Sequence, residues 1–128
     1  MRVEGRTERE SGFNFEKLEV WWEAQALAER VYQATRAFPG DERFGLTTQV
    51  RRAAVSISSN IAEGSSRASR LDFARFIEIA AGSVFELVSQ LSLATRLGYL
   101  GDEERGTLCE HAARVSRMLS GLRKSLVG

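Results

Sequence analysis

Apolar residues recur along most of the chain at alternating spacings of four and three positions. From Phe15 to about Phe38 the series is Val20, Ala24, Leu27, Val31, Ala34 and Phe38. This spacing places the side chains on one face of a helix that packs at a shallow angle against other helices. The sequence Pro39-Gly40-Asp41 follows, and proline and glycine at this point predict that the helix ends.

The same spacing returns three more times. It predicts a second helix from about Glu42 to Glu63, a third from Ser69 to Leu97 and a fourth from Asp102 to about Leu126. The apolar positions of the second helix are Leu46, Val50, Ala53, Ile57 and Ile61. Those of the third are Phe73, Ile77, Ala80, Val84, Leu87, Leu91 and Ala94. Those of the fourth are Leu108, Ala112, Val115, Leu119, Leu122 and Leu126.

Residues with a preference for helix ends lie at the predicted boundaries. Gly64 is expected to cap the second helix, and Gly98 to end the third. Ser69, with Asp72 three residues on, and Asp102 are expected to cap the N-termini of the third and fourth helices.

Four helices joined by short connections predict an all-α fold, an antiparallel up-down-up-down four-helix bundle comprising residues 15–128. Residues 1–14 are polar and lack periodicity, so we expect a flexible N-terminal arm there. A chain of 128 residues has room for one such domain.

The net charge is only +1, but it alternates along the chain. Residues 1–42 carry 6 basic and 9 acidic groups (−3), and residues 43–75 carry 6 and 2 (+4). Residues 76–104 carry 1 and 5 (−4), and residues 105–128 carry 5 and 1 (+4). In the predicted bundle the acidic first and third helices therefore lie beside the basic second and fourth, which favours this pairing modestly.

Composition predicts a soluble cytoplasmic protein. A single cysteine, Cys109, cannot form an internal disulfide, which favours a reducing compartment. The first twelve residues lack the apolar segment of a signal peptide, and no later apolar run is long enough to span a bilayer. No membrane partner is expected.

The reactive side chains do not form a catalytic set. Cys109 and His111 are two residues apart, which turns their side chains about 200° from each other on a helix and excludes a thiolate–imidazole pair. One histidine and one cysteine cannot supply a zinc site without carboxylate ligands, and the serines of the second helix have no neighbouring base. We predict no enzymatic activity, no metal, no cofactor and no small-molecule substrate.

Polar residues on the second and third helices suggest a structural network instead. Asn60 falls on or beside the apolar series, where an amide needs hydrogen-bond partners. The predicted network, which fixes the helix register and includes an arginine at position 51 or 52, comprises Asn60, Glu63, Glu86 and Gln90. A di-metal centre would need Glu-x-x-His pairs, which are absent. Gly82 costs about 1 kcal/mol relative to alanine, so we expect a neighbouring helix to approach closely there.

Basic residues supply the candidate nucleic-acid contacts. Of the 18 basic residues 16 are arginine, which suits bidentate binding of phosphate. The candidates on the second, third and fourth helices are Arg51, Arg52, Arg67, Arg70, Arg75, Arg114, Arg117 and Lys124. The alternative is a solvated or internally paired set, because the net charge is close to zero.

Additional aromatic residues lie beside the apolar series and suggest an interface between copies of the chain. Two adjacent tryptophans diverge by about 100° on a helix, so both cannot point into one narrow core. The candidate interface residues are Trp21, Trp22, Tyr32, Phe76 and Phe85. The alternative is that Trp22 folds over the bundle edge and covers the stem of Lys17 or Arg30.

Several motifs stand out along the chain: Phe15-Glu-Lys-Leu-Glu-Val-Trp21, Arg43-Phe-Gly-Leu-Thr-Thr-Gln-Val-Arg-Arg-Ala-Ala-Val-Ser56, Ser59-Asn-Ile-Ala-Glu-Gly64, Gly82-Ser83, Glu86-Leu87 and Leu97-Gly-Tyr99. Together they resemble the four-helix-bundle proteins encoded in intervening sequences of bacterial large-subunit ribosomal RNA genes. The resemblance covers roughly residues 15 to 124. It departs at Ser58, where the family pattern has proline, and this predicts a straighter second helix.

The resemblance implies a non-catalytic protein. The family is similar to the accessory variability proteins of diversity-generating retroelements, bundles that form pentamers and engage a reverse transcriptase and nucleic acid. It therefore implies a homo-oligomer, a pentamer by this relation, with RNA or DNA and a reverse transcriptase as partners. The alternative hypothesis is a structural or protein–protein interaction module with no nucleic-acid role.

Overall fold

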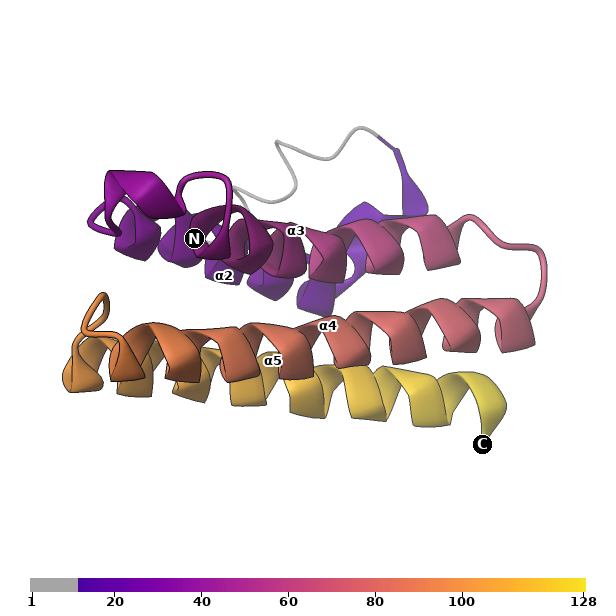
Figure 1. Cartoon of the computed structure of the whole chain (residues 1–128). Helices are drawn as coiled ribbons and strands as arrows, with labels where there is room; N and C mark the ends of the chain where they lie inside the picture. The colour runs from indigo at the N-terminus through magenta and orange to yellow at the C-terminus, as the bar shows by residue number, and fades with distance from the viewer. Residues whose placement is uncertain (1–11) are drawn as a thin grey trace.

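A computed structural model describes residues 12–128, and every regular element in this part of the chain is helical (Figure 1). The elements are η1 (Asn14–Lys17), α2 (Glu19–Thr35), η2 (Gly40–Glu42), α3 (Leu46–Ser65), α4 (Arg70–Arg96) and α5 (Asp102–Val127). The predicted all-α four-helix fold class is confirmed. The arm predicted for residues 1–14 lies, up to residue 11, outside the described residues.

The four long helices form a closed square in which each packs against two neighbours. The packed pairs are α2/α3, α3/α4, α4/α5 and α5/α2. Hydrogen bonds join Ser56 to Ser83 across α3/α4 and Arg105 to Ser92 across α4/α5. These contacts fit antiparallel neighbours and the predicted up-down-up-down order. In Figure 1, α3 and α4 lie in front, with α2 behind α3 and α5 behind α4.

The predicted apolar series form the core. On each helix nearly every predicted position is buried, because the spacing of four and three keeps these side chains on the inner face. Phe73, Leu122 and Leu126 are the exceptions, since they are only half-buried at the end of the bundle where α3 ends and α4 begins. Fully buried Leu87 and Leu119 show that the series on α4 and α5 face the same interior.

The first predicted helix is interrupted. Leu18 has an extended backbone (φ −96°, ψ 118°), which separates η1 from α2. The indole N–H of Trp22 donates to the carbonyl of Glu16 at 2.9 Å and holds η1 against α2. At the other end, α2 stops at Thr35, before Phe38. The range predicted for the first helix, Phe15 to about Phe38, therefore extends beyond α2 at both ends, which periodicity alone does not show.

Glu42 links the connection between α2 and α3 to the opposite pair of helices. We predicted α3 from Glu42, but the helix begins at Leu46, and Glu42 lies in η2. The Glu42 carboxylate accepts hydrogen bonds from the backbone N–H of Leu46 at 3.1 Å and the hydroxyl of Tyr99 at 3.0 Å. The bond to the carboxylate raises the pKa of Tyr99. The ring of Phe38 packs on Tyr99 at 5.6 Å and closes this end of the core.

Gly64 is not the cap of α3, contrary to our prediction. The helix continues to Ser65, and Gly64 is buried against α4. A Cβ atom at this position would lie 2.7 Å from Cβ of Phe76 and 3.0 Å from Cδ1 of Phe73. The absence of a side chain therefore allows α3 and α4 to approach closely.

The other predicted helix ends are largely confirmed. Gly98 has φ +83° and ends α4, as glycine does at left-handed positions. Ser69 caps α4 by accepting from the N–H of Asp72 at 3.0 Å. Asp102 is the first residue of α5, and Gly101 occupies the cap position. Gly82 contradicts our expectation, because a Cβ atom there meets nothing within 4 Å and no helix of the protomer approaches it.

Core truncation should be costly. We predict that Leu87→Ala or Leu119→Ala lowers the free energy of unfolding by about 2–5 kcal/mol, through lost burial and the cavity that remains. Chemical denaturation of the purified variants measures this. Leu71→Ala on α4 is the control. Because Leu71 is exposed, this substitution should lower the free energy of unfolding by less than about 1 kcal/mol. Equal losses at the three positions would contradict the assigned core.

Glycine-to-alanine substitutions should differ in sign between Gly106 in α5 and Gly64 near the end of α3. Alanine is normally favoured over glycine in a helix by about 1 kcal/mol. At Gly106, which has open space around it, Gly106→Ala should raise the free energy of unfolding by up to about this amount. At Gly64 the clash with Phe73 and Phe76 should outweigh the gain, and Gly64→Ala should lower it by about 1 kcal/mol. Urea titrations of both variants compare the two effects, and a stabilising Gly64→Ala would refute the close contact.

Candidate interaction surfaces

The two tryptophans predicted at an interface pack mainly within the protomer. Their rings meet edge to face with centroids 5.0 Å apart. Phe15 lies 4.8 Å from Trp21, and Phe13 stacks on Phe15 at 5.7 Å. Both tryptophans are half-buried in this aromatic cluster, which fastens η1 to α2. Trp21 and Trp22 therefore have a structural role in the single chain.

The other three interface candidates differ in exposure. Phe76 is half-buried against Gly64 and lies under the guanidinium of Arg67 at 4.6 Å. Tyr32 is 41% exposed and lies under Arg51 at 4.6 Å. Phe85 is 72% exposed, and no ring or cation of the described residues packs on it. Among the five candidates Phe85 is the one that points most clearly to a partner.

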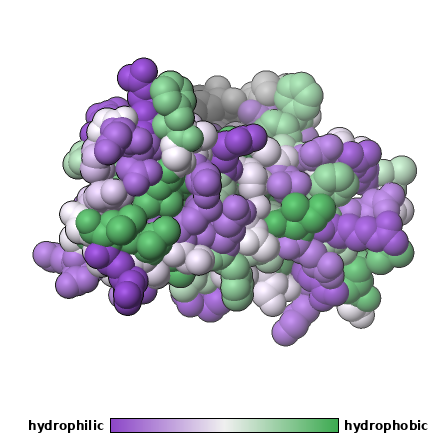
Figure 2. All heavy atoms as spheres, viewed as in Figure 1, coloured by the Kyte–Doolittle hydropathy of each residue, from purple (hydrophilic) through white to green (hydrophobic). Residues whose placement is uncertain are grey.

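Phe85 belongs to a larger apolar surface, which we call the outer face of α4. Its members are exposed and lie within about 120° of the helix circumference; they are Leu71, Ile79, Gly82, Phe85 and Leu93, with Leu97 at the C-cap. Figure 2, which views the α3–α4 side, shows apolar groups along α4 with polar side chains between them. These residues give the protomer an apolar strip that its own helices leave uncovered.

Helix α4 has more apolar residues than the protomer buries. Among residues 12–128, α4 is the one helix that is long and apolar enough to cross a membrane, by length and composition alone. Our prediction that no apolar segment is long enough to span a bilayer is therefore wrong for α4. Only 33% of its most apolar stretch is buried. Because α4 packs against only α3 and α5, it buries one face, and Ile79, Phe85 and Leu93 remain exposed on the other side.

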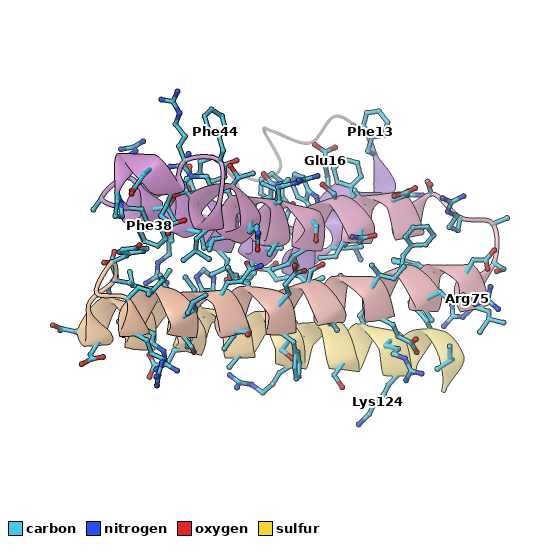
Figure 3. The ribbon with its side chains drawn as sticks, in the orientation of Figure 1. Phe13, Glu16, Phe38, Phe44, Arg75 and Lys124 are labelled. Carbon is cyan, nitrogen blue, oxygen red and sulfur yellow. The ribbon has the colours of Figure 1, made fainter. Side chains whose placement is uncertain are left out.

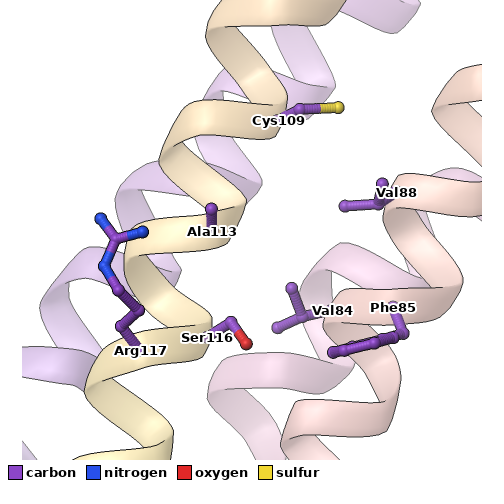
Figure 4. A pocket seen from close by; sticks show the side chains of 7 residues that line it. All are labelled: Val84, Phe85, Val88, Cys109, Ala113, Ser116 and Arg117. Carbon is purple, nitrogen blue, oxygen red and sulfur yellow. The ribbon is translucent and has the colours of Figure 1, made fainter.

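A groove runs between α4 and α5. It has a volume of about 390 Å³ and is lined by Val84, Phe85 and Val88 from α4 and by Cys109, Ala113, Ser116 and Arg117 from α5 (Figure 4). Three of the four α5 residues, Cys109, Ala113 and Ser116, are small, which leaves room for a group from outside. We call this the α4/α5 groove.

A second depression lies on the opposite side of the square, between α2 and α3. It has a volume of about 430 Å³, and its lining includes Trp22, Gln25, Ala28, Glu29 and Tyr32 from α2 and Val55 and Ser58 from α3. Ser58, the residue that departs from the family pattern, is buried and accepts a hydrogen bond from Gln25 at 2.9 Å, which links α2 to α3. We call this depression the α2/α3 hollow.

The predicted nucleic-acid residues do not form one surface in the protomer. Four of them, Arg67, Arg70, Arg75 and Lys124, gather where α3 ends and α4 begins, and Figure 3 labels Arg75 and Lys124 at this end. Arg51 and Arg52 lie in the first half of α3, and Arg114 and Arg117 lie midway along α5.

Most of these basic residues already have partners within the chain. Arg67 pairs with Glu63, Arg75 with Asp72 and Arg114 with Glu23, at 3.1, 3.3 and 3.6 Å. Arg70 donates to the carbonyls of Ser125 and Leu126 at the end of α5, and Arg51 donates to the hydroxyl of Thr35 at 2.8 Å. Within residues 12–128, Arg52, Arg117 and Lys124 have no ion-pair partner.

The structure does not bring together the four residues of the predicted polar network. Asn60 donates to the carbonyl of Ser56 at 2.8 Å, and Gln90 donates to Glu86 at 3.3 Å, in both cases within one helix. Glu63 is next to Gly64, which lies against Phe76 of α4. Phe76 is ten positions from Glu86 on the same helix, a distance of about 15 Å along its axis. The antiparallel register therefore separates the two carboxylates, which the sequence spacing did not show.

A polar cluster that we did not predict joins α2 to α5. His111 Nε2 lies 3.0 Å from a carboxylate oxygen of Glu23, and Arg30 lies 3.0 Å from Nδ1. Arginine can only donate, so Nδ1 accepts and Nε2 carries the hydrogen that His111 donates to Glu23. Arg114 completes the cluster beside Glu23. The alternation of acidic and basic helices is the sequence feature from which this contact between α2 and α5 could have been predicted.

The reactive side chains are arranged as the helix geometry predicted. Cys109 lines the α4/α5 groove, whereas His111 faces α2, so the two do not form a pair. Residues 12–128 contain no group of three or more histidine, cysteine, aspartate or glutamate side chains placed to hold a metal ion.

Comparison with known proteins places the chain in a family. The model of the 23S rRNA-intervening sequence proteins matches residues 16–121, which include all four long helices apart from the last turns of α5. The chain belongs to the 23S rRNA-intervening sequence protein family. No curated protein matches it.

A solved structure supports the fold of this intervening sequence protein. It is a protein of unknown function from the S23 ribosomal protein family of Bacteroides thetaiotaomicron VPI-5482, 24% identical, with a TM-score of 0.75. The match covers 82% of this chain and 95% of that chain. The resemblance stated from the motifs is thus confirmed for the family, while the relation to retroelement accessory proteins stays a prediction.

Proposed function

We propose that this intervening sequence protein is a non-catalytic bundle that assembles into a closed homo-oligomer and binds RNA in its assembled form. The observation that carries the proposal is the uncovered outer face of α4, which includes the exposed ring of Phe85. Exposed apolar surfaces of this extent in small proteins mark interaction sites. The number of copies implied by the family resemblance is five.

The magnitude of the apolar effect supports assembly. Suppose that two copies together remove roughly 800 Å² of apolar surface from water. At ~25 cal/mol per Å² the gross gain is about 20 kcal/mol. Association costs about 4–15 kcal/mol in lost freedom of motion. A contact that removed this much apolar surface would have a favourable net free energy.

The RNA part of the proposal rests on the basic end of the bundle. Arg67, Arg70, Arg75 and Lys124 come from three segments of the chain and gather at this end. One protomer has a net charge of only +1, but a ring of copies repeats this basic end around one axis. Such repetition raises the local potential that a phosphate backbone meets.

One observation favours a second candidate, a protein-interaction module without nucleic acid. Arg51, Arg67, Arg70, Arg75 and Arg114 already have partners within the chain, so RNA would have to compete with these contacts. Assembly is common to both candidates. RNA binding distinguishes them.

Assembly should depend on Phe85. Light scattering should give the wild-type protein several times the protomer mass of 14.2 kDa at micromolar concentration. Phe85→Asp should lower the mass toward one protomer while helix content is kept, because a charge would be buried at the contact. Val127→Asp, a similar change at a half-exposed residue at the end of α5, is the control and should leave the mass unchanged. A wild-type mass near 14 kDa contradicts assembly.

RNA binding should depend on the basic end and weaken steeply with salt. We predict that Arg75→Glu with Lys124→Glu abolishes most retention of a single-stranded RNA and reduces the slope of log affinity against log salt. Arg36→Glu with Arg96→Glu makes the same charge change at the other end and is the matched control. Fluorescence anisotropy at several salt concentrations gives both quantities. An equal loss for the two double variants, or no retention by the wild type, contradicts RNA binding at this end.

A further inference from the structure

The α4/α5 groove and the α2/α3 hollow each combine an empty space with an exposed aromatic side chain. Phe85, which is 72% exposed, stands at the groove, and Tyr32, which is 41% exposed, stands at the hollow. Figure 4 shows Phe85 and Val88 on one side of the groove and the small residues of α5 on the other. Each surface therefore has both a projecting ring and a space of about 400 Å³ that a ring from another molecule can enter.

The two surfaces also carry opposite unpaired charges. Arg117 is exposed at the α4/α5 groove and has no ion-pair partner within residues 12–128. Glu29 is exposed at the α2/α3 hollow and likewise has none in the described part of the chain. A contact between the surfaces would place a guanidinium beside a carboxylate at the edge of an apolar centre, the usual composition of a protein interface.

The surfaces lie on opposite sides of the bundle, because α2/α3 and α4/α5 are opposite pairs of the square. They cannot meet within one protomer. A contact between two copies would leave the same two surfaces free at the ends, so it would repeat until a ring closes. A face of two helices about 40 Å long and about 20 Å wide offers about 800 Å², the area per partner of a standard stable interface.

We propose that the α4/α5 groove of one copy binds the α2/α3 hollow of the next copy, head to tail. Phe85 enters the hollow, Tyr32 of the neighbouring copy enters the groove, and Arg117 pairs with Glu29 across the contact. This proposal rests on the assembly proposed above and names its two surfaces. It assigns Arg117, a candidate for nucleic acid by sequence, to the contact between copies.

The position of Gly82 agrees with this arrangement. It lies on the outer face of α4, one turn from Phe85, and has nothing within 4 Å of an added Cβ. Glycine in a helix interior costs about 1 kcal/mol relative to alanine, and nothing in the protomer compensates for it. A neighbouring copy that docks on Phe85 would approach the backbone of α4 at this residue.

Cross-linking tests the arrangement with the cysteine that the chain already has. Cys109 lines the groove, and Val55, which is 40% exposed, lines the hollow. In the Val55→Cys variant a short bismaleimide should join residue 109 of one copy to residue 55 of the next. Denaturing gels should then show a ladder beyond the dimer. The wild type, and Val55→Cys combined with Cys109→Ser, should give no ladder.

The possible results distinguish a failure of the head-to-tail contact from a failure of oligomer formation. Cross-linked dimers of the wild type through Cys109 would indicate a two-fold contact and overturn the head-to-tail arrangement. An oligomer by light scattering without a Val55→Cys ladder would also overturn it, while the assembly would stand. A protomer mass, with flotation on phosphatidylcholine vesicles, would overturn both, because the outer face of α4 would then bind lipid.

Charge reversal gives a second readout. Glu29→Arg alone and Arg117→Glu alone should each raise the dissociation concentration about tenfold, because like charges then face each other across the contact. The double variant should return to within about threefold of the wild type. Additive weakening in the double variant would overturn the proposed pairing. Helix content measured on all three variants shows whether the protomers remain folded.

Discussion

The close packing of α3 against α4 determines most of the remaining structure. Gly64 lets the α3 backbone approach Phe73 and Phe76, and the hydroxyls of Ser56 and Ser83 meet further along the same pair. Two such contacts fix both the distance and the register of the helices. Once the inner face of α4 is fixed in this way, the side chains on its opposite face are directed to solvent. Phe85 and the apolar residues around it are exposed for this reason, and the proposed assembly depends on that exposure.

The fold could be predicted from the sequence because the information is periodic and local. The apolar series give the four helices, and Ser69 and Gly98 end α4 where residue preference predicts. The exceptions depend on contacts that spacing does not contain. Leu18 interrupts the first helix because Trp22 binds the backbone of η1, and Gly64 serves helix packing where its place near the end of α3 suggested a cap.

The interaction surfaces could be predicted only in part, because exposure depends on which neighbours a side chain finds. Trp21 and Phe85 are both aromatic residues beside the core series, but the first packs in an intramolecular cluster and the second does not. Exposed arginines differ in the same way. Arg70 donates to a backbone carbonyl at the end of α5, whereas Arg117 has no ion-pair partner within residues 12–128. Glu63 and Glu86 are separated by a register that only the α3–α4 contact fixes.

The central claim is that another copy of the chain covers the outer face of α4. Hydroxyl-radical footprinting read by mass spectrometry measures the solvent accessibility of single side chains, and it can be carried out at concentrations below and above the onset of assembly. The account predicts that Phe85 and Tyr32 are strongly labelled at low concentration and several-fold protected at high concentration. Phe44, which is 87% exposed between η2 and α3, lines neither the groove nor the hollow and should be labelled equally at both. Equal labelling of Phe85 at the two concentrations would contradict the account.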